Sequence, residues 1–342
     1  MDDFRQEYFQ KWASIEICNL VDGLVYFRSV ARISIIDLGT NTFNLLVVET
    51  RGREVVGKLH QEKIPVKLGE GGINLGLILE KPYQRGLEAM QKYAAISKDL
   101  AVDKVFAFAT SAIRSSGNGV QFVEDVKSSC GISVTIIDGQ QEAELIYRGV
   151  QLSGALSEHN SLILDIGGGS CEFIICNRNR YFWKHSFDLG VSRLYDRFKH
   201  QNPILPSEIE TIQLLFETEL QVLFNALKQF PTTELIGSSG SFDTFAEMIS
   251  FRKFGEDRVS NLKEYRFDLE EFNAVHQSLL HSTVSERYQM PGLIAMRVDM
   301  IVIASILVDY LIKKLGIESM KVSAYSLKEG VMELVLRDEF LI

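Results

Sequence analysis

The chain has 342 residues, of which 46% are hydrophobic and 24% charged, a composition typical of a soluble globular protein with about two domains. A formal net charge of −9 argues against a nucleic-acid-binding surface, and it requires that local cations and metal ions attract any polyanionic substrate. Four scattered cysteines, and six histidines without zinc-binding spacing, favour reduced thiols in a cytoplasmic protein.

Residues 1–31 show no clear hydrophobic period and no glycine punctuation, and we assign no function to this N-terminal extension. Its first residues also lack the pattern of a secretory signal. From Ile33 onward, strands and helices alternate. The predicted elements are a strand, turn and strand from Ile33, a strand at 53–60, a glycine-rich loop at 68–76, a helix at 83–99, a strand at 104–110, a loop at 111–119, a helix at 120–129 and a strand at 132–138.

The second half of the sequence repeats this plan. Its predicted elements are a helix at 139–153, strands at 161–166, 171–177 and 180–187, a helix at 207–229, a strand and helix start within 234–245, a helix at 293–315, a strand at 320–325 and a closing helix from Leu327. A capping box of Ser207 and Glu210 is expected to open the helix at 207–229. The apolar run at 300–308 is too short to cross a bilayer, so we interpret it as a buried core helix and expect no membrane partner.

Each half begins with a β-hairpin whose turn contains an aspartate, an apolar residue and a glycine. The two aspartates, Asp37 and Asp165, are 128 positions apart. These matched positions predict a duplicated α/β domain, with a first domain at 32–138 and a second at 139–326. The C-terminal helix at about 327–342 is a candidate to return to the first domain.

Two such turns that face one cleft form a candidate phosphate site. The backbone N–H groups of a turn with few side chains can surround a phosphate, because no Cβ blocks the approach. Short polar donors accompany the turns: Thr40, Asn41, Thr42 and Ser170. Asp37 and Asp165 lie at strand ends, where a carboxylate can hold Mg²⁺, or another divalent cation, directly or through water. For either turn alone, an ordinary glycine-rich hairpin is the alternative.

Four segments carry a family resemblance in this order and spacing: IDLGTNTFNLLVVE, ATSAIRSS, GQQEAELIYRGV and LILDIGGGSCEFII. Together they resemble the exopolyphosphatase and guanosine pentaphosphate phosphohydrolase family, which belongs to the superfamily of sugar kinases, heat-shock chaperone ATPases and actin. The resemblance covers the chain from about residue 32 to the C-terminus. It implies an α/β fold of two duplicated actin-like (ribonuclease H-like) domains, whose mixed sheets face an interdomain cleft.

The resemblance also implies roles for individual residues. Glu142 matches the catalytic base of the family, and its place at a helix start predicts that the helix dipole keeps it ionised. Arg114 matches a phosphate-contacting arginine. Glu172 matches an acidic position that we expect to support metal or water, together with Asp37 and Asp165. The phosphate-binding residues implied are Gly39, Thr40, Asn41, Thr42, Arg114, Gly167, Gly168, Gly169 and Ser170.

Each of these side chains also has a purely structural interpretation. Glu142 is then a helix-start carboxylate with a capping role, Arg114 a solvated surface arginine and Glu172 an outward-facing strand residue. Glu144, two residues after Glu142, is a weaker candidate for the base. Further candidates for a basic cleft lining, each with an ordinary surface charge as the alternative, are Lys67, Arg148, Arg193 and Lys328.

The sequence departs from the family pattern at three places. Asn44 stands where family members commonly carry a basic or imidazole side chain, which leaves one substrate contact unassigned. Residues 237–241, GSSGS, replace a nucleotide-site glycine loop with a serine-rich one. Residues 323–330 differ from the family's S-D-x-G-x-R-E-G, and the variant positions are Ala324, Ser326 and Lys328. These departures leave the hydrolytic centre intact and weaken any inference about a nucleotide.

The predicted function is Mg²⁺-dependent hydrolysis of the terminal phosphoanhydride of inorganic polyphosphate, which releases orthophosphate. Guanosine pentaphosphate phosphohydrolysis is the close alternative, since the same anhydride is cut. A kinase of the same superfamily is a different class, against which Glu142 in its helix context counts. A catalytically weak polyphosphate or nucleotide sensor is a further alternative. The assembly expected, if the chain associates, is a homodimer.

Overall fold

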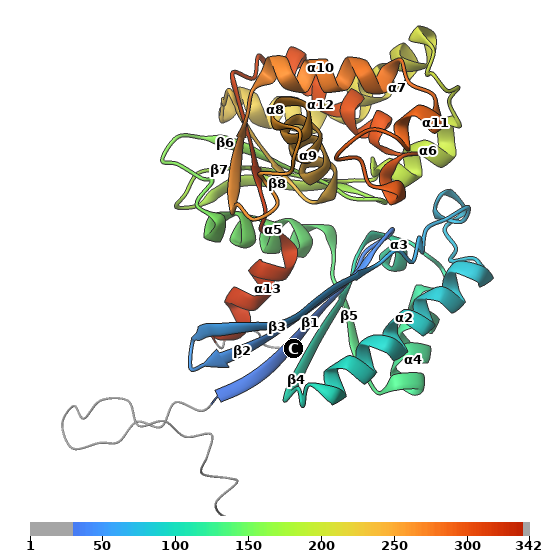
Figure 1. Ribbon diagram of the computed structural model, residues 1–342, viewed down its shortest axis with the longest axis vertical. Helices are drawn as coiled ribbons and strands as arrows, with labels where there is room; N and C mark the ends of the chain where they lie inside the picture. Colours follow the sequence, from blue (N-terminus) through green and yellow to red (C-terminus); the bar gives the residue numbers. More distant parts are fainter. Residues whose placement is uncertain (1–29, 338–342) are drawn as a thin grey trace, which may run out of the picture.

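The computed structural model describes residues 30–337, so the expectation for residues 1–29 lies outside the described part. The chain folds into two sheets with helices packed on them, one above the other in Figure 1. In spatial order, the first sheet contains β3 (Glu54–Ile64), β2 (Phe43–Arg51), β1 (Val30–Leu38), β4 (Lys104–Ala109) and β5 (Val134–Ile136). The second contains β10 (Glu264–Phe267), β11 (Ser319–Ser323), β9 (Glu234–Ser238), β6 (Ser161–Ile166), β7 (Cys171–Cys176) and β8 (Tyr181–Phe187).

Helices and short 3-10 segments connect these strands. The strands of the first sheet are connected by η1 (Ile73–Leu75), α2 (Glu80–Asp99), α3 (Ser111–Arg114) and α4 (Gly119–Cys130). Helix α5 (Gly139–Ser153) leads to the second sheet. The second half continues with α6 (Val191–Phe198), α7 (Pro206–Glu219), α8 (Gln221–Gln229), α9 (Gly240–Phe254), α10 (Leu269–Leu280), α11 (Val284–Arg287), η2 (Ala295–Arg297), α12 (Ile301–Leu315) and α13 (Leu327–Leu336).

The two sheets repeat one topology, which agrees with the duplication predicted from the sequence. β1 pairs antiparallel with β2 and parallel with β4, and β6 pairs in the same way with β7 and β9. Every residue of β6 and β7 is buried, because apolar side chains cover both faces of these strands. The carboxyl ends of β1, β4, β6 and β9 open on one pocket, where loops after parallel strands commonly bind ligands.

Helices α5 and α13 lie between the two sheets and cross at close range (Figure 1). A Cβ at Gly149 would lie 1.9 Å from the Ser326 carbonyl oxygen, and one at Gly330 would lie 1.9 Å from the Leu145 carbonyl oxygen. Only glycine permits this approach of two backbones. The crossing brings the first turn of α5 and the start of α13 to the same pocket.

Two predicted elements of the second half differ in the structure. The helix expected at 207–229 is divided at Leu220, which leaves the helical conformation (φ −88°, ψ 12°) while its side chain enters the core. The predicted capping box is also wrong: at the start of α7, Glu208 rather than Glu210 accepts a hydrogen bond from a backbone N–H, that of Leu205, at 2.8 Å.

Two further boundaries are corrected. The segment 111–119, expected to be a loop, begins with the short helix α3. The helix expected at 293–315 begins only at Ile301, after the 3-10 segment η2. Its residues from Ile301 to Val308 are all buried, which confirms the interpretation of this run as a core helix.

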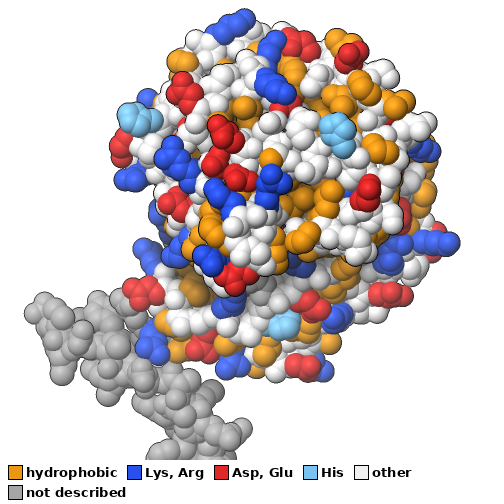
Figure 2. All heavy atoms as spheres, turned by 45° about the horizontal axis from the view of Figure 1, so that its top comes forward, with side chains coloured by type: hydrophobic (Ala, Val, Ile, Leu, Met, Phe, Trp, Pro, Cys, Tyr) orange, Lys and Arg blue, Asp and Glu red, His pale blue; other side chains and the backbone are white. Residues whose placement is uncertain are grey.

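One face of the molecule, drawn in Figure 2, carries mixed charge. Basic and acidic side chains are interspersed over the face drawn in Figure 2. Among residues 30–337, no helix has the length and apolar character needed to cross a membrane.

Candidate active site

The two hairpin turns line one pocket between the sheets, as the sequence predicts. In each turn the first glycine donates a backbone hydrogen bond to a carbonyl three residues later, from Gly39 to Thr42 at 3.2 Å and from Gly167 to Ser170 at 3.0 Å. A Cβ at either glycine would lie 2.9 Å from that carbonyl oxygen. The two turns are therefore equivalent in backbone geometry, and both require glycine at this position.

The tips of the turns pack against each other. A Cβ on Gly168 would lie 2.8 Å from Nδ2 of Asn41, and a Cβ on Gly169 would lie 2.7 Å from Oγ1 of Thr40. The sequence predicted that these glycines leave room for a phosphoryl group. The structure adds a correction: because the glycines have no side chains, the side chains of the opposite turn also pack against them. Asn41 further accepts a hydrogen bond from Ser192 at 2.6 Å, so this contact holds the two halves together.

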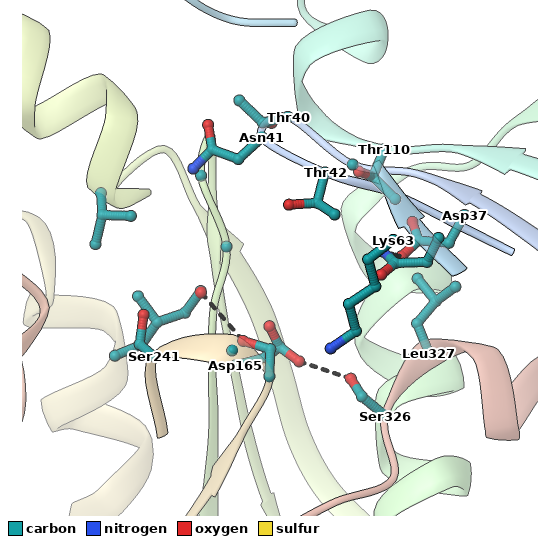
Figure 3. A pocket seen from close by; sticks show the side chains of 18 of the residues that line it. Asp37, Thr40, Asn41, Thr42, Lys63, Thr110, Asp165, Ser241, Ser326 and Leu327 are labelled. Carbon is teal, nitrogen blue, oxygen red and sulfur yellow. Dashed lines mark hydrogen bonds between the residues drawn. The ribbon is translucent and has the colours of Figure 1, made fainter. Parts of the chain in front are cut away.

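The two aspartates point into the pocket from the ends of β1 and β6 (Figure 3). Asn44 donates to Asp37 at 2.9 Å from the neighbouring strand, and Ser326 donates to Asp165 at 2.7 Å from the start of α13. Burial raises the pKa of Asp37 to about 6, although Lys328 and Asn44 act in the opposite direction. Asn44 and Ser326, two of the departures from the family pattern, thus each donate a hydrogen bond to one of the aspartates.

These aspartates fit a magnesium ion that also binds substrate oxygens. Among residues 30–337, no three Asp, Glu, His or Cys side chains come close enough to form a complete metal site by themselves. Mg²⁺ is commonly held by one or two carboxylates, by waters and by substrate phosphates. Asp37, which is half-buried, and Asp165, which is buried, provide two carboxylates of this kind.

Glu172 lies beneath the pocket rather than on its wall. It is opposite Asp165 in the β6–β7 pair, is 1% exposed and accepts a hydrogen bond from Ser186 at 2.6 Å. Burial, and next the adjacent carboxylate of Glu142, raises the pKa of Glu172 far above its usual range. The outward-facing interpretation of Glu172 is therefore wrong, while its support of a metal or water stays a prediction.

Glu142 lies in the first turn of α5 and lines the pocket. The cap of this helix is Asp138, whose carboxylate accepts hydrogen bonds from the N–H groups of Gln140 and Gln141, so the capping role considered for Glu142 is wrong. Burial raises the pKa of Glu142 to about 7, although Arg114 lowers it. Burial is the largest cause acting on this pKa, so the place of Glu142 at a helix start does not keep the carboxyl fully ionised at neutral pH, contrary to the expectation from the sequence. A pKa near neutrality suits a general base.

Arg114 holds this candidate base. Its Nη1 atom donates to the Glu142 carboxylate at 2.7 Å and to the Ile137 carbonyl oxygen at 3.1 Å. Its side chain is 22% exposed, so the solvated-surface interpretation is wrong. Arg114 lies behind Glu142 rather than on the pocket wall, and its contact with phosphate stays a prediction.

Four cations of the described chain line the pocket: Lys63, Lys67, Arg297 and Lys328. The sequence identified Lys67 and Lys328 as candidates but missed Lys63 and Arg297, which belong to no motif. The position of Lys63 follows from strand pairing, since it lies opposite Asn44 in the β2–β3 ladder. Burial lowers the pKa of Lys328, but Glu329 and other neighbouring carboxylates raise it more, so this ammonium group stays charged.

Two other candidates belong to an ion-pair network outside the pocket. Glu144 contacts Lys184 at 2.7 Å and Arg148 at 3.3 Å, and Arg148 also reaches Glu333 of α13 at 3.5 Å. These pairs fix α5 against β8 and α13. Glu144 is therefore not placed to act as the base, and Arg148 is not part of the cleft lining.

Arg193 connects the two halves of the molecule. From α6 it donates to the carbonyl oxygen of Gly169 at 3.1 Å and to that of Ile73, in the first half, at 3.3 Å. In the reverse direction, Asn74 donates to the Arg193 carbonyl oxygen at 2.9 Å. The side chain of Arg193 is 16% exposed, so it is a bridge across the cleft rather than a surface charge.

Comparison with known proteins identifies the family. A family model described as the Ppx/GppA phosphatase family matches residues 46–338. The chain belongs to the Ppx/GppA phosphatase family.

Solved structures and a curated relative resemble this Ppx/GppA family protein. An exopolyphosphatase from Cytophaga hutchinsonii is 40% identical with a TM-score of 0.86, and the match covers 90% of this chain and 98% of that one. A family member from Aquifex aeolicus, at 21% identity and a TM-score of 0.75, covers 91% and 100% and shows the fold alone.

The curated relative is a guanosine-5'-triphosphate,3'-diphosphate pyrophosphatase from Aeromonas hydrophila. It is 24% identical to this chain over 300 residues, which make up 87% of the chain. The chain spans 58% of the length of this relative.

Proposed function

We propose that this Ppx/GppA family protein hydrolyses the terminal phosphoanhydride of inorganic polyphosphate in the presence of Mg²⁺. The observation that carries the proposal is Glu142, a buried carboxyl with a raised pKa, fixed by Arg114 beside the two glycine turns. The four lining cations supply positive charge for a chain of linked phosphates. The similar structure from Cytophaga hutchinsonii is named an exopolyphosphatase, which supports the same substrate.

In the proposed reaction, Glu142 accepts a proton from a water molecule as the water oxygen forms a bond to the terminal phosphorus. The bond from this phosphorus to the bridging oxygen breaks, and the shortened chain leaves with the electron pair on that oxygen. Arg114 orients the carboxylate and lowers its pKa, which increases the ionised fraction at neutral pH. Mg²⁺ held by Asp37 and Asp165 would neutralise phosphoryl charge.

Guanosine pentaphosphate is the second candidate substrate. The Aeromonas hydrophila relative is named for a guanosine nucleotide of this class, and the bond to be cut is again a terminal phosphoanhydride. The lining cations serve either polyanion, so the two substrates differ only in what the leaving group carries.

One assay tests the proposal. Phosphate release is measured from polyphosphates of several lengths and from guanosine pentaphosphate, each with Mg²⁺ and with a chelator. We expect Mg²⁺-dependent release from polyphosphate at a higher kcat/KM than from the nucleotide. Preference for the nucleotide would favour the second candidate. Tight binding of either compound without phosphate release would instead support a sensor.

A further inference from the structure

Ser111 is a buried serine at the pocket wall whose hydroxyl has no hydrogen-bond partner among residues 30–337. It is the first residue of α3, one position after Thr110, which follows β4, is 3% exposed and lines the pocket together with Glu142 and Gly169. A Cβ built on Gly169 would lie 2.5 Å from the Ser111 hydroxyl oxygen. The hydroxyl therefore faces the glycine turn of the other half of the molecule.

The internal duplication shows that the fold does not need this hydroxyl. Thr110 and Ser239 occupy equivalent places after β4 and β9, and each hydroxyl donates to the carbonyl oxygen at the end of the neighbouring strand, at 3.4 Å and 3.1 Å. The next residue is Ser111 in the first half but Gly240 in the second, and both begin a helix. The same strand–helix junction thus forms without a hydroxyl at this position.

A buried hydroxyl without a protein partner is destabilising, so its position in a pocket wall points to a ligand that completes its hydrogen bond. We propose that Ser111 is a substrate-binding residue whose hydroxyl donates a hydrogen bond to a phosphoryl oxygen of the bound polyphosphate. This inference rests on the proposed hydrolysis at the same pocket. Ser111 and Glu142 line the same pocket, so the phosphoryl group bound by Ser111 lies in the pocket of the proposed base.

The test uses the full chain with Glu142→Gln as the parent, because this variant is expected to bind without turnover. Binding of tripolyphosphate with Mg²⁺ is measured by calorimetry, and the thermal midpoint is measured without ligand. Ser111→Ala should raise the Kd roughly 10- to 100-fold, as expected for loss of a hydrogen bond to a charged group. Its thermal midpoint should be unchanged or higher, because an unpaired polar group is removed.

The matched control is Ser116→Ala, whose hydroxyl lies in the same segment and donates to the Ala112 carbonyl oxygen at 2.6 Å. It should lower the thermal midpoint and leave the Kd unchanged. A Kd for Ser111→Ala within about twofold of the parent overturns the proposal, as does a raised Kd with a midpoint that falls as in the control. Absence of tripolyphosphate binding by the parent, with no phosphate release by the wild type, overturns the proposed function together with this inference.

Discussion

The two hairpin turns share one backbone but hold their aspartates differently. In the first, Asp37 faces Asn44 across the strand pair and receives a hydrogen bond from it. In the second, Asp165 faces Glu172, a second buried acid, and its donor comes from Ser326 on a distant helix. The first turn is therefore completed by its own hairpin, whereas the second is completed only when α13 packs against it.

The tips of the turns differ in a complementary way. Thr40 and Asn41 carry side chains where the second turn has Gly168 and Gly169, and the side chains of one tip occupy the space left by the other. A duplicated motif has thus diverged into two parts that fit each other. The difference indicates that neither turn forms the site alone.

The largest expected effect comes from Glu142, which lies between the turns and tests both together. Glu142→Gln should lower kcat by about 10²- to 10⁴-fold, since the amide cannot accept the proton. The KM for polyphosphate should stay the same or fall, because a negative charge near the phosphates is removed. The thermal midpoint should not fall, because burial penalises the charged carboxylate. Activity within about threefold of wild type would show that Glu142 is not the base.

If both turns hold the metal, Asp37→Asn and Asp165→Asn should have similar consequences. Each should reduce Mg²⁺-supported turnover by more than about 10²-fold, since metal-assisted charge stabilisation contributes several kcal/mol. The exposed Asp99→Asn is the control and should match wild type. Turnover is measured over a range of Mg²⁺ concentrations. If Mg²⁺-supported turnover falls in only one of the two variants, only the turn with that aspartate binds the metal.

Gly168→Ala should disturb the fit between the two tips. The added Cβ would lie 2.8 Å from Asn41, and overpacking of this kind typically costs about 1–3 kcal/mol of unfolding free energy. Asn41→Gly in the same chain should recover part of the loss, because the added Cβ would still lie 2.9 Å from Cβ of Thr40. Denaturant unfolding of both single variants and the double variant measures this coupling. The control is Gly57→Ala, whose Cβ would meet no atom of the described residues within 4 Å. Additive effects in the double variant would contradict close packing of the two tips.

The smallest expected effect is a shift in pH dependence. Wild-type kcat should fall as the pH drops below about 7, because Glu142 then takes up a proton. Arg114→Gln removes the cation that lowers the pKa of Glu142, so the acid limb should move to higher pH. Arg114→Lys keeps a positive charge and should shift it less. The acid limbs are compared in profiles of kcat against pH for the wild type and the two variants. Coincident acid limbs would show that Arg114 does not lower the pKa of Glu142.

Much of the fold and of the site could be predicted because their signals are local. The bounds of α5 and β6 agree with the prediction at every residue, since hydrophobic period and capping are set by neighbours in sequence. The prediction of one helix at 207–229 was wrong because the cause of the break is not local. Leu220 leaves the helical conformation, and its side chain enters a core formed by distant segments. The matched motifs predicted that Asp37, Glu142 and Asp165 share one pocket, and the structure places all three there, between the two sheets that carry the turns.

The sequence by itself thus determined the duplicated plan, the family and the pocket's central acids. Only the tertiary structure decided which partner each charged group has. Arg114 contacts Glu142 rather than lying at the surface, Arg193 bridges the halves, and Lys63 joins the pocket through strand pairing. Such pairings, and the pKa values that depend on them, arise where segments far apart in the chain bury charged side chains together. Hydrophobic period predicts which apolar residues are buried, but it does not predict the partner of a charged group.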